Sequence, residues 1–224
     1  MKSVVLYFKQ EFSLFPKQPF NFDGTFHKPS HFSNVLKLEE FVSGSYWQTL
    51  RFGEHLFGLR IEDELTLLKP KLLVSVFSSA VLPNEIIEQI KQEISYRFEL
   101  DVDLQEFNHM AQKDKIFYPV FKKWTGTRNS CQHNLYELLI ISVVLQNATV
   151  RRSVQMLDAL LEKYGTKAAF DGKEIYTIWL PQDLENVSEQ ELRDLKIGYR
   201  AKFIKRISSD FVLNLRCKSP ILEN

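Results

Sequence analysis

Short runs of apolar and β-favouring residues occur along much of the chain before residue 84, and these runs predict β-strands. Two such runs, YWQTLRF at 46–52 and HLFGLRI at 55–61, are separated by Gly53 and Glu54. A Gly-X pair in this place predicts a two-residue hairpin of type II′. Further strands are predicted at residues 4–8, 65–68 and 71–77.

The hydrophobic spacing changes to a helical period at residue 84. Within NEIIEQIKQEISYRF, the apolar residues Ile87, Ile90, Ile94 and Phe98 fall on one face of a helix. We therefore expect an α+β protein whose residues 1–104 form an N-terminal antiparallel β-sheet domain with a flanking helix.

The chain from residue 105 to residue 224 is predicted to be helical. A polar helix is expected at 103–113. Residues 135–145, LYELLIISVVL, are apolar on nearly every side, which is typical of a helix in the middle of a bundle. Four of its side chains are therefore expected to be nearly solvent-free: Leu138, Leu139, Ile141 and Leu145.

The next helix has recognisable signals at both ends. Thr149 can cap it, and apolar residues then recur at helical spacing as far as Tyr164. Gly165 can close the helix at the C′ position.

Two more helices complete the predicted bundle. The sequence from Ser188 to Glu191 is a capping box, and it predicts a helix that ends near Gly198. The last helix begins at about Tyr199, and one face carries Ile204, Ile207 and Phe211.

Composition limits the function classes without choosing among them. With 224 residues, of which 44% are hydrophobic and 25% charged, the chain is typical of a soluble globular protein. The formal net charge is only +1, so affinity for nucleic acid would have to come from a local basic surface. No apolar run approaches the roughly 20 residues that a membrane span needs.

The two cysteines do not indicate a metal site or a disulfide framework. Cys131 and Cys217 are far apart and have no metal-ligand spacing, so we expect two free thiols, no metal and no cofactor. Free thiols and the lack of a signal peptide favour a cytoplasmic protein, at the nucleoid or, in a eukaryote, in the nucleus.

Basic residues occur at one helix end where stability would favour acidic ones. Arg151 and Arg152 follow Thr149 in the first turn, where the helix dipole is already positive. An anion bound at this helix end would explain them. Solvated surface arginines are the alternative.

A second basic stretch, KIGYRAKFIKR, covers residues 196–206. It holds five basic residues and no acidic one. Gly198 permits a tight turn whose backbone N–H groups can face a phosphate, and Tyr199 beside Arg200 offers an aromatic ring and a planar guanidinium to unstacked bases. The alternative is an ordinary loop between helices with a buried tyrosine.

Three segments in order resemble the helix-hairpin-helix DNA glycosylases, the superfamily of the 8-oxoguanine and 3-methyladenine glycosylases. The segments are LYELLIISVVLQNATVRRSVQMLDALLEKYG, SEQELRDLKIGYRAKFI, and FNFDGTFHKPSHF followed by YWQTLRF. The resemblance implies base-excision repair on double-stranded DNA, in which a damaged base is turned out of the helix before its glycosidic bond is cut.

The resemblance also implies roles for particular residues. Asn147 matches a wedge residue that fills the space left by the extruded base, and Tyr199 matches an aromatic wedge on the other side. Arg152 and Arg200 match arginines that read the orphaned partner base. Further DNA contacts are expected at Gln146, Arg151, Gly198 and Lys202.

The resemblance has two departures. The 8-oxoguanine enzymes use a glycine near the start of the sheet domain to recognise the lesion, and Pro29 stands at about that place. In the family, a glycine-rich hairpin with the catalytic lysine and aspartate follows the Gly-Tyr-Arg segment, but no glycine follows Gly198. Asp194 and Asp210 lie before that position, so no catalytic residue is assigned.

The sequence therefore predicts the N-terminal part of a DNA glycosylase for damaged purines, with AP lyase activity possible in the intact enzyme. Cytosine offers acceptors at O2 and N3 that suit two arginines, which favours 8-oxoguanine opposite cytosine as the substrate. The alternatives are an alkylated-base glycosylase of the 3-methyladenine type and a non-catalytic damaged-DNA-binding module. The 224-residue chain by itself is expected to release no base.

Overall fold

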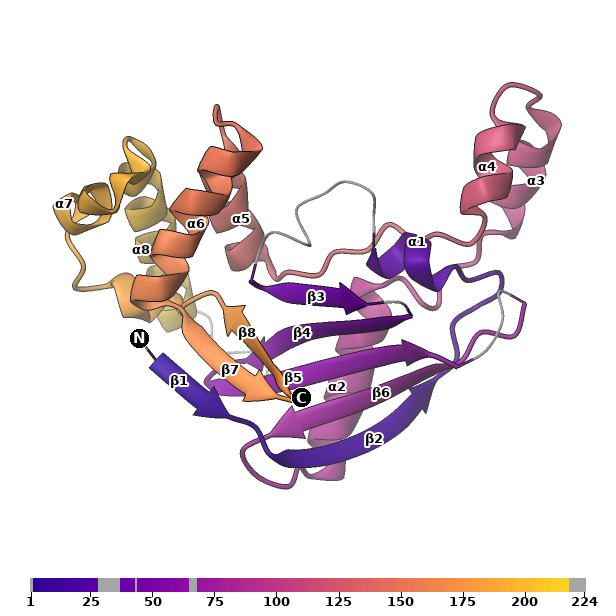
Figure 1. The fold of residues 1–224 in the computed structure, drawn as a ribbon, viewed down its shortest axis with the longest axis horizontal. Coiled ribbons are helices and arrows are strands. Elements are labelled where there is room, and N and C mark those ends of the chain that lie inside the picture. The colour runs from indigo at the N-terminus through magenta and orange to yellow at the C-terminus, as the bar shows by residue number, and fades with distance from the viewer. Residues whose placement is uncertain (1, 28–36, 43, 65–67, 218–224) are drawn as a thin grey trace.

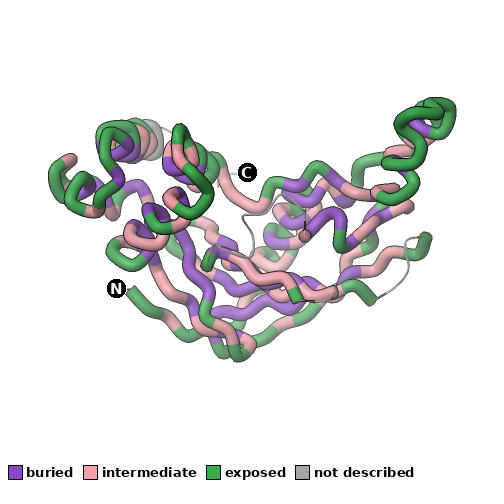
Figure 2. The backbone as a smooth tube through the Cα atoms, turned by 45° about the horizontal axis from the view of Figure 1, so that its top comes forward, coloured by how far each residue is buried: buried purple, intermediate pink, exposed green. Residues whose placement is uncertain are grey.

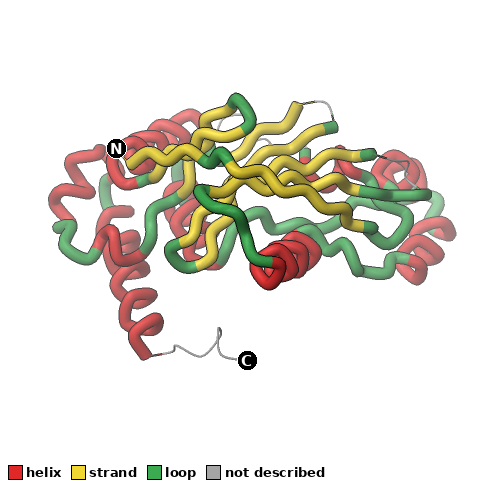
Figure 3. Tube along the Cα trace, turned by 90° about the horizontal axis from the view of Figure 1, so that it is seen from below, coloured by secondary structure: helices red, strands yellow, loops and turns green. Residues whose placement is uncertain are grey.

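Strands form the middle of the molecule, and helices gather at its two ends and on one face of the larger sheet (Figures 1 and 3). The computed structural model describes residues 2–27, 37–42, 44–64 and 68–217. It confirms the α+β fold with an N-terminal antiparallel sheet. No helix within these ranges is both long and apolar enough to cross a membrane.

The larger sheet has five antiparallel strands in the order β2-β6-β5-β4-β3. Its strands are β2 (Phe8–Leu14), β3 (Glu39–Val42), β4 (Ser45–Phe52), β5 (His55–Asp63) and β6 (Leu72–Ser78). The short helix α1 (Phe22–Phe26) lies at one end of it, and α2 (Asn84–Arg97) packs on one face. Ile90, Ile94 and Phe98 are buried there, as the helical spacing predicts.

The hairpin between β4 and β5 has the predicted two-residue turn. Phe52 pairs with His55, and Gly53 has a φ of 52° while Glu54 has no positive φ. A positive φ at the first turn residue alone is what a type II′ turn requires. The strand expected at 65–68 falls largely outside the described residues.

A smaller, three-stranded sheet was not predicted from the sequence. It consists of β1 (Lys2–Val5), β7 (Thr166–Phe170) and β8 (Lys173–Thr177), with β1 parallel to β7. Asp171 lies in the turn between β7 and β8. It accepts a hydrogen bond from Trp47 Nε1 at 2.8 Å and forms an ion pair with Arg60 at 3.1 Å. The two sheets are thereby joined.

One end of the molecule is a bundle built from α5 (Leu135–Leu145), α6 (Val150–Tyr164), α7 (Glu189–Leu192) and α8 (Arg200–Cys217). The first two match the predicted ranges, and Thr149 caps α6 by accepting from Arg152 N at 3.3 Å. Gly165 does end α6, but its φ is −67° and not the left-handed value of a C′ glycine. Glycine is needed there because a Cβ would lie 2.6 Å from Leu161 O.

The prediction that α5 is buried on all sides is wrong. Ile141 is only 8% exposed, but Leu138 is 41% exposed, and Leu139 and Leu145 are half-buried. Only one side of α5 packs against α6 and α8, through Tyr136, Ile140, Ile141 and Val144. Figure 2 shows that the helices at this end of the molecule carry both buried and exposed residues. The predicted apolar face of α8 does enter this core, with Ile204 fully buried.

At the other end, α3 (Gln105–Lys113) and α4 (Tyr118–Trp124) form a helical hairpin that stands clear of the sheet (Figure 1). Ala111 is the only buried residue of α3 and Phe121 the only one of α4. Most of the hairpin's large apolar side chains are exposed: Phe107, Met110, Ile116, Phe117, Tyr118 and Val120.

Candidate nucleic-acid interface

Two short loops lie side by side at the outer end of the helical bundle. The first, residues 146–149, joins α5 to α6. The second, residues 196–199, contains the last two residues of a π-helical turn at Arg193–Ile197 and leads into α8. We call these the first loop and the second loop.

Each loop contains a non-glycine residue in the left-handed backbone region. Asn147 has a φ of 48° and Lys196 a φ of 60°. Gly198 also has a positive φ, of 64°, but glycine adopts such values readily. Asparagine tolerates this conformation better than lysine does, because its short amide can bond locally. Such backbone persists only where the surroundings hold it in place, and it is common at functional sites.

Two arginines hold the loops together by crossing between them. Arg152, in the first turn of α6, donates from Nη2 to Lys196 O in the second loop. Arg200, in the first turn of α8, donates from Nη2 to Gln146 O in the first loop. The structure thus brings together residues that are about fifty positions apart in the sequence, as expected for Asn147, Arg152, Tyr199 and Arg200.

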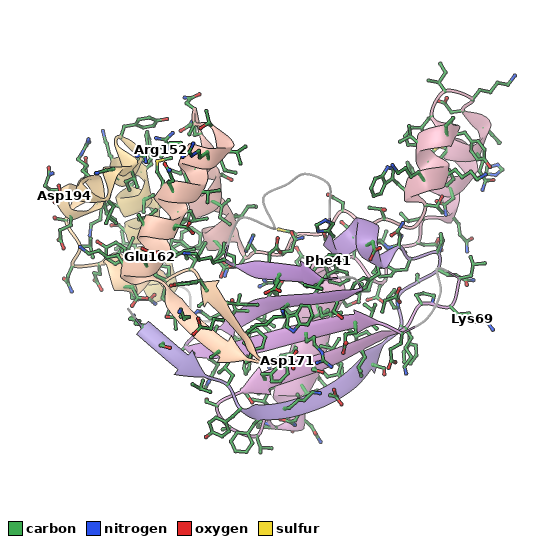
Figure 4. All side chains as sticks on the ribbon, in the orientation of Figure 1. Phe41, Lys69, Arg152, Glu162, Asp171 and Asp194 are labelled. Atoms are coloured by element: carbon green, nitrogen blue, oxygen red, sulfur yellow. The ribbon has the colours of Figure 1, made fainter. Side chains whose placement is uncertain are left out.

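The two wedge candidates are accessible and the two arginines less so. Asn147 is exposed and the Tyr199 side chain is 43% exposed, whereas Arg152 is half-buried and Arg200 only 7% exposed. The Arg200 guanidinium lies 4.8 Å from the centre of the Tyr199 ring, which places a cation against the ring that could meet a base. Figure 4 shows Arg152 at the outer end of α6.

The other expected contact residues surround these loops. Gln146, Arg151, Gly198 and Lys202 are all exposed. The sequence analysis missed Phe203, which is 45% exposed and meets the Tyr199 ring edge-on at 6.2 Å. Its position, four residues after Tyr199 on the predicted helix, was the available signal.

A buried hydrogen-bond chain within the bundle joins the first turn of α5, the segment that follows β8, and α8. Trp179 Nε1 donates to Tyr136 Oη at 2.9 Å, and Tyr136 Oη lies 2.8 Å from Ser208 Oγ. Burial raises the pKa of Tyr136 to about 12, so the phenol stays protonated and can serve this chain. This buried part of the bundle core is therefore uncharged.

The two aspartates considered in the sequence, Asp194 and Asp210, make contacts with residues four positions away. Asp194 accepts from Gln190 at 2.8 Å, and Asp210 forms a long ion pair with Arg206 at 3.9 Å. Within the part of the chain that the structure describes, no three His, Cys, Asp or Glu residues are grouped to hold a metal ion. Pro29, at the place of the lesion-recognition glycine, lies outside the described residues.

Comparison with solved structures places this architecture among known enzymes. A 3-methyladenine DNA glycosylase from Archaeoglobus fulgidus superimposes with a TM-score of 0.73 over 88% of this chain, at 12% identity. An 8-oxoguanine glycosylase/lyase from Clostridium acetobutylicum superimposes with a TM-score of 0.61 over 93% of the chain, at 16% identity. The chain has the DNA glycosylase fold.

The sequence comparison agrees with this fold. A probable N-glycosylase/DNA lyase from Methanothermobacter thermautotrophicus is 23% identical over 138 residues, which are 53% of this chain. No family model matches the chain. The match covers 44% of that relative, and the chain spans 66% of the A. fulgidus glycosylase and 66% of the C. acetobutylicum enzyme.

Proposed function

We propose that this protein acts in base-excision repair as a DNA glycosylase. We also propose that the two loops carry the wedge residues, which fill the space left in the DNA by the extruded damaged base. The pairing of the loops carries the proposal, because it places an exposed amide side chain and an exposed aromatic ring at one outer edge of a glycosylase fold. An enzyme that extrudes a base must fill the resulting gap and hold the partner base. Asn147 and Tyr199 have the size and exposure for the first task.

We further propose that the substrate is an oxidised purine opposite cytosine. The solved C. acetobutylicum enzyme was crystallised with DNA in which cytosine is opposite 8-oxoguanine. Arg152 supports the same preference here: it is half-buried and, among the described residues, its guanidinium makes one hydrogen bond, to Lys196 O. Its other donors are suited to cytosine O2 and N3, whereas thymine presents an N3–H that repels a donor.

Binding to a duplex with a stable abasic analogue tests the wedge. The 224-residue chain should bind that duplex roughly ten-fold more tightly than an intact one, with cytosine preferred over thymine opposite the gap. Asn147→Ala and Tyr199→Ala should remove the difference. The matched control is Tyr96→Ala on α2, a tyrosine that is 82% exposed on another part of the molecule. Equal affinity for the abasic and intact duplexes would contradict the proposal.

A base-release assay tests the chemistry. With duplexes that carry 8-oxoguanine or an alkylated purine, we expect the 224-residue chain to bind without releasing base. Multiple turnovers would place the catalytic groups within these residues. Tighter binding with no cytosine preference would favour an alkylated-base glycosylase, the activity named for the A. fulgidus structure.

A further inference from the structure

We propose that Phe203 is a positioning residue, which braces the Tyr199 ring in the orientation in which that ring enters the DNA. This inference rests on the proposed function, in which Tyr199 is one of the two wedges. It assigns Phe203 a role through Tyr199 and no contact with the DNA itself.

The Tyr199 ring is held by packing and not by a hydrogen bond. Its hydroxyl has no hydrogen-bond partner among the described residues, and the residue before it, Gly198, has a φ of 64° and no side chain. The ring is 43% exposed. The Arg200 guanidinium lies 4.8 Å from the ring centre, and the centre of the Phe203 ring lies 6.2 Å away.

The geometry of the two rings is that of a favourable aromatic pair. Phe203 lies in the first turn of α8, four residues after Tyr199, and side chains at this spacing are neighbours on a helix. The ring planes are perpendicular, at 90°, and edge-to-face pairs are stable at this centre-to-centre distance. The Phe203 ring therefore favours one orientation of the Tyr199 ring over the others.

The exposure of Phe203 also points to this role. Phe203 is 45% exposed, whereas Ala201 and Ile204 on the same turn of α8 are fully buried in the bundle core. At an exposed helix position, leucine or lysine stabilises the helix more than phenylalanine does. The core and the helix thus give little reason for a phenyl ring here, and the neighbouring Tyr199 ring provides one.

A braced ring should bind the DNA gap more tightly than a free one. A side chain that is already ordered loses less conformational freedom when it enters the DNA. An aromatic pair of this kind shifts an equilibrium by about two- to ten-fold. Loss of the Phe203 ring should therefore weaken binding at the gap, and should do so only while Tyr199 is present.

Binding to a duplex with an abasic analogue, compared with an intact duplex, tests this dependence. Phe203→Leu removes the ring but keeps the apolar bulk, so it should weaken binding to the abasic duplex about three-fold and leave binding to the intact duplex unchanged. Phe203→Tyr keeps the ring and should restore the affinity. In a Tyr199→Ala background, Phe203→Leu should have no further effect, because two residues that act together are not additive.

The matched control is Phe107→Leu on α3. Phe107 is 46% exposed and meets the Phe117 ring edge-on at 6.2 Å, so it has the same exposure and ring geometry at the other end of the molecule. Its replacement should leave the affinity for both duplexes unchanged.

A second measurement needs no DNA. With 3-fluorotyrosine placed at position 199 alone, the ¹⁹F line should narrow in Phe203→Leu, because the ring moves more freely, and should keep the wild-type width in Phe203→Tyr and Phe107→Leu. An unchanged width in Phe203→Leu would show that Phe203 does not brace the ring.

Two further outcomes separate this inference from the proposed function. If Phe203→Leu weakens binding equally with and without Tyr199, Phe203 contacts the DNA directly and the positioning role is wrong. If wild type binds abasic and intact duplexes equally, the proposed function fails instead, and the ¹⁹F line width still decides whether Phe203 braces Tyr199.

Discussion

At the scale of single residues, Glu137 shows how one carboxylate holds the start of α5. Asn134 and Glu137 form a capping box: Glu137 N donates to Asn134 Oδ1 at 2.9 Å, and Asn134 N donates to Glu137 Oε2 at 3.1 Å. Burial alone raises the pKa of Glu137, but the hydrogen bond and charge of His133, the charge of Arg97 and the Asn134 N–H outweigh it. The pKa of Glu137 is therefore lower than its ordinary value.

The lowered pKa predicts a pH dependence of stability. Because the folded-state pKa lies below the unfolded one, the stabilisation is present above the unfolded value of about 4.3 and is lost as the pH falls through the folded value. Glu137→Gln keeps the shape but removes the charge, so it should cost about 1 kcal/mol in the free energy of unfolding at pH 7. In urea unfolding curves, the gap between wild type and variant should close below about pH 4.

A glutamate on the protein surface provides the control. Glu88 on α2 pairs with Lys91 and its side chain is 61% exposed, so Glu88→Gln should change little at either pH. If wild type and Glu137→Gln differ in the free energy of unfolding by the same amount at pH 7 and at pH 3.5, the charge of Glu137 contributes nothing to stability.

At the scale of elements, helix limits were predictable, but burial and some strands were not. The ends of α5 and α6 agree with the sequence because capping residues act locally. The pattern of α5 could not show which side is buried, since apolar residues surround it. The hairpin β7–β8 was missed although Asp171-Gly172, with φ values of 51° and 72°, was a hairpin signal in the sequence.

The one-sided burial of α5 predicts unequal effects of two similar substitutions. Ile140 is fully buried, so Ile140→Ala should cost about 2–5 kcal/mol in the free energy of unfolding. Leu138 is 41% exposed, so Leu138→Ala should cost less than about 1 kcal/mol. Thermal or urea unfolding of the two variants decides this, and equal losses would mean that α5 is enclosed on both sides.

At the scale of the whole molecule, the fold depends on contacts between distant parts of the chain. Lys2 pairs with Thr166, and Trp47 bonds to Asp171, so the N-terminal strand and the larger sheet are both tied to the hairpin that follows α6. No local sequence pattern predicts that β1 pairs in parallel with the distant strand β7. The free energy of such a pairing depends on the rest of the fold, which must first bring the two strands together. The meeting of the two loops was predictable only through resemblance, and the bonds that join them came from the structure.

The α3–α4 hairpin has a consequence for how the protein is degraded. Because Ala111 and Phe121 are its only buried helix residues, the hairpin can open while the sheet and the bundle stay folded. A protease should therefore cut here first, at the exposed Lys113, Lys115 or Phe117, and at a rate set by local opening and not by global unfolding. Brief digestion with trypsin or chymotrypsin, followed by mass spectrometry, should give one early pair of fragments that meet near residue 115. Simultaneous cuts throughout the chain would show that the hairpin opens only when the entire molecule does.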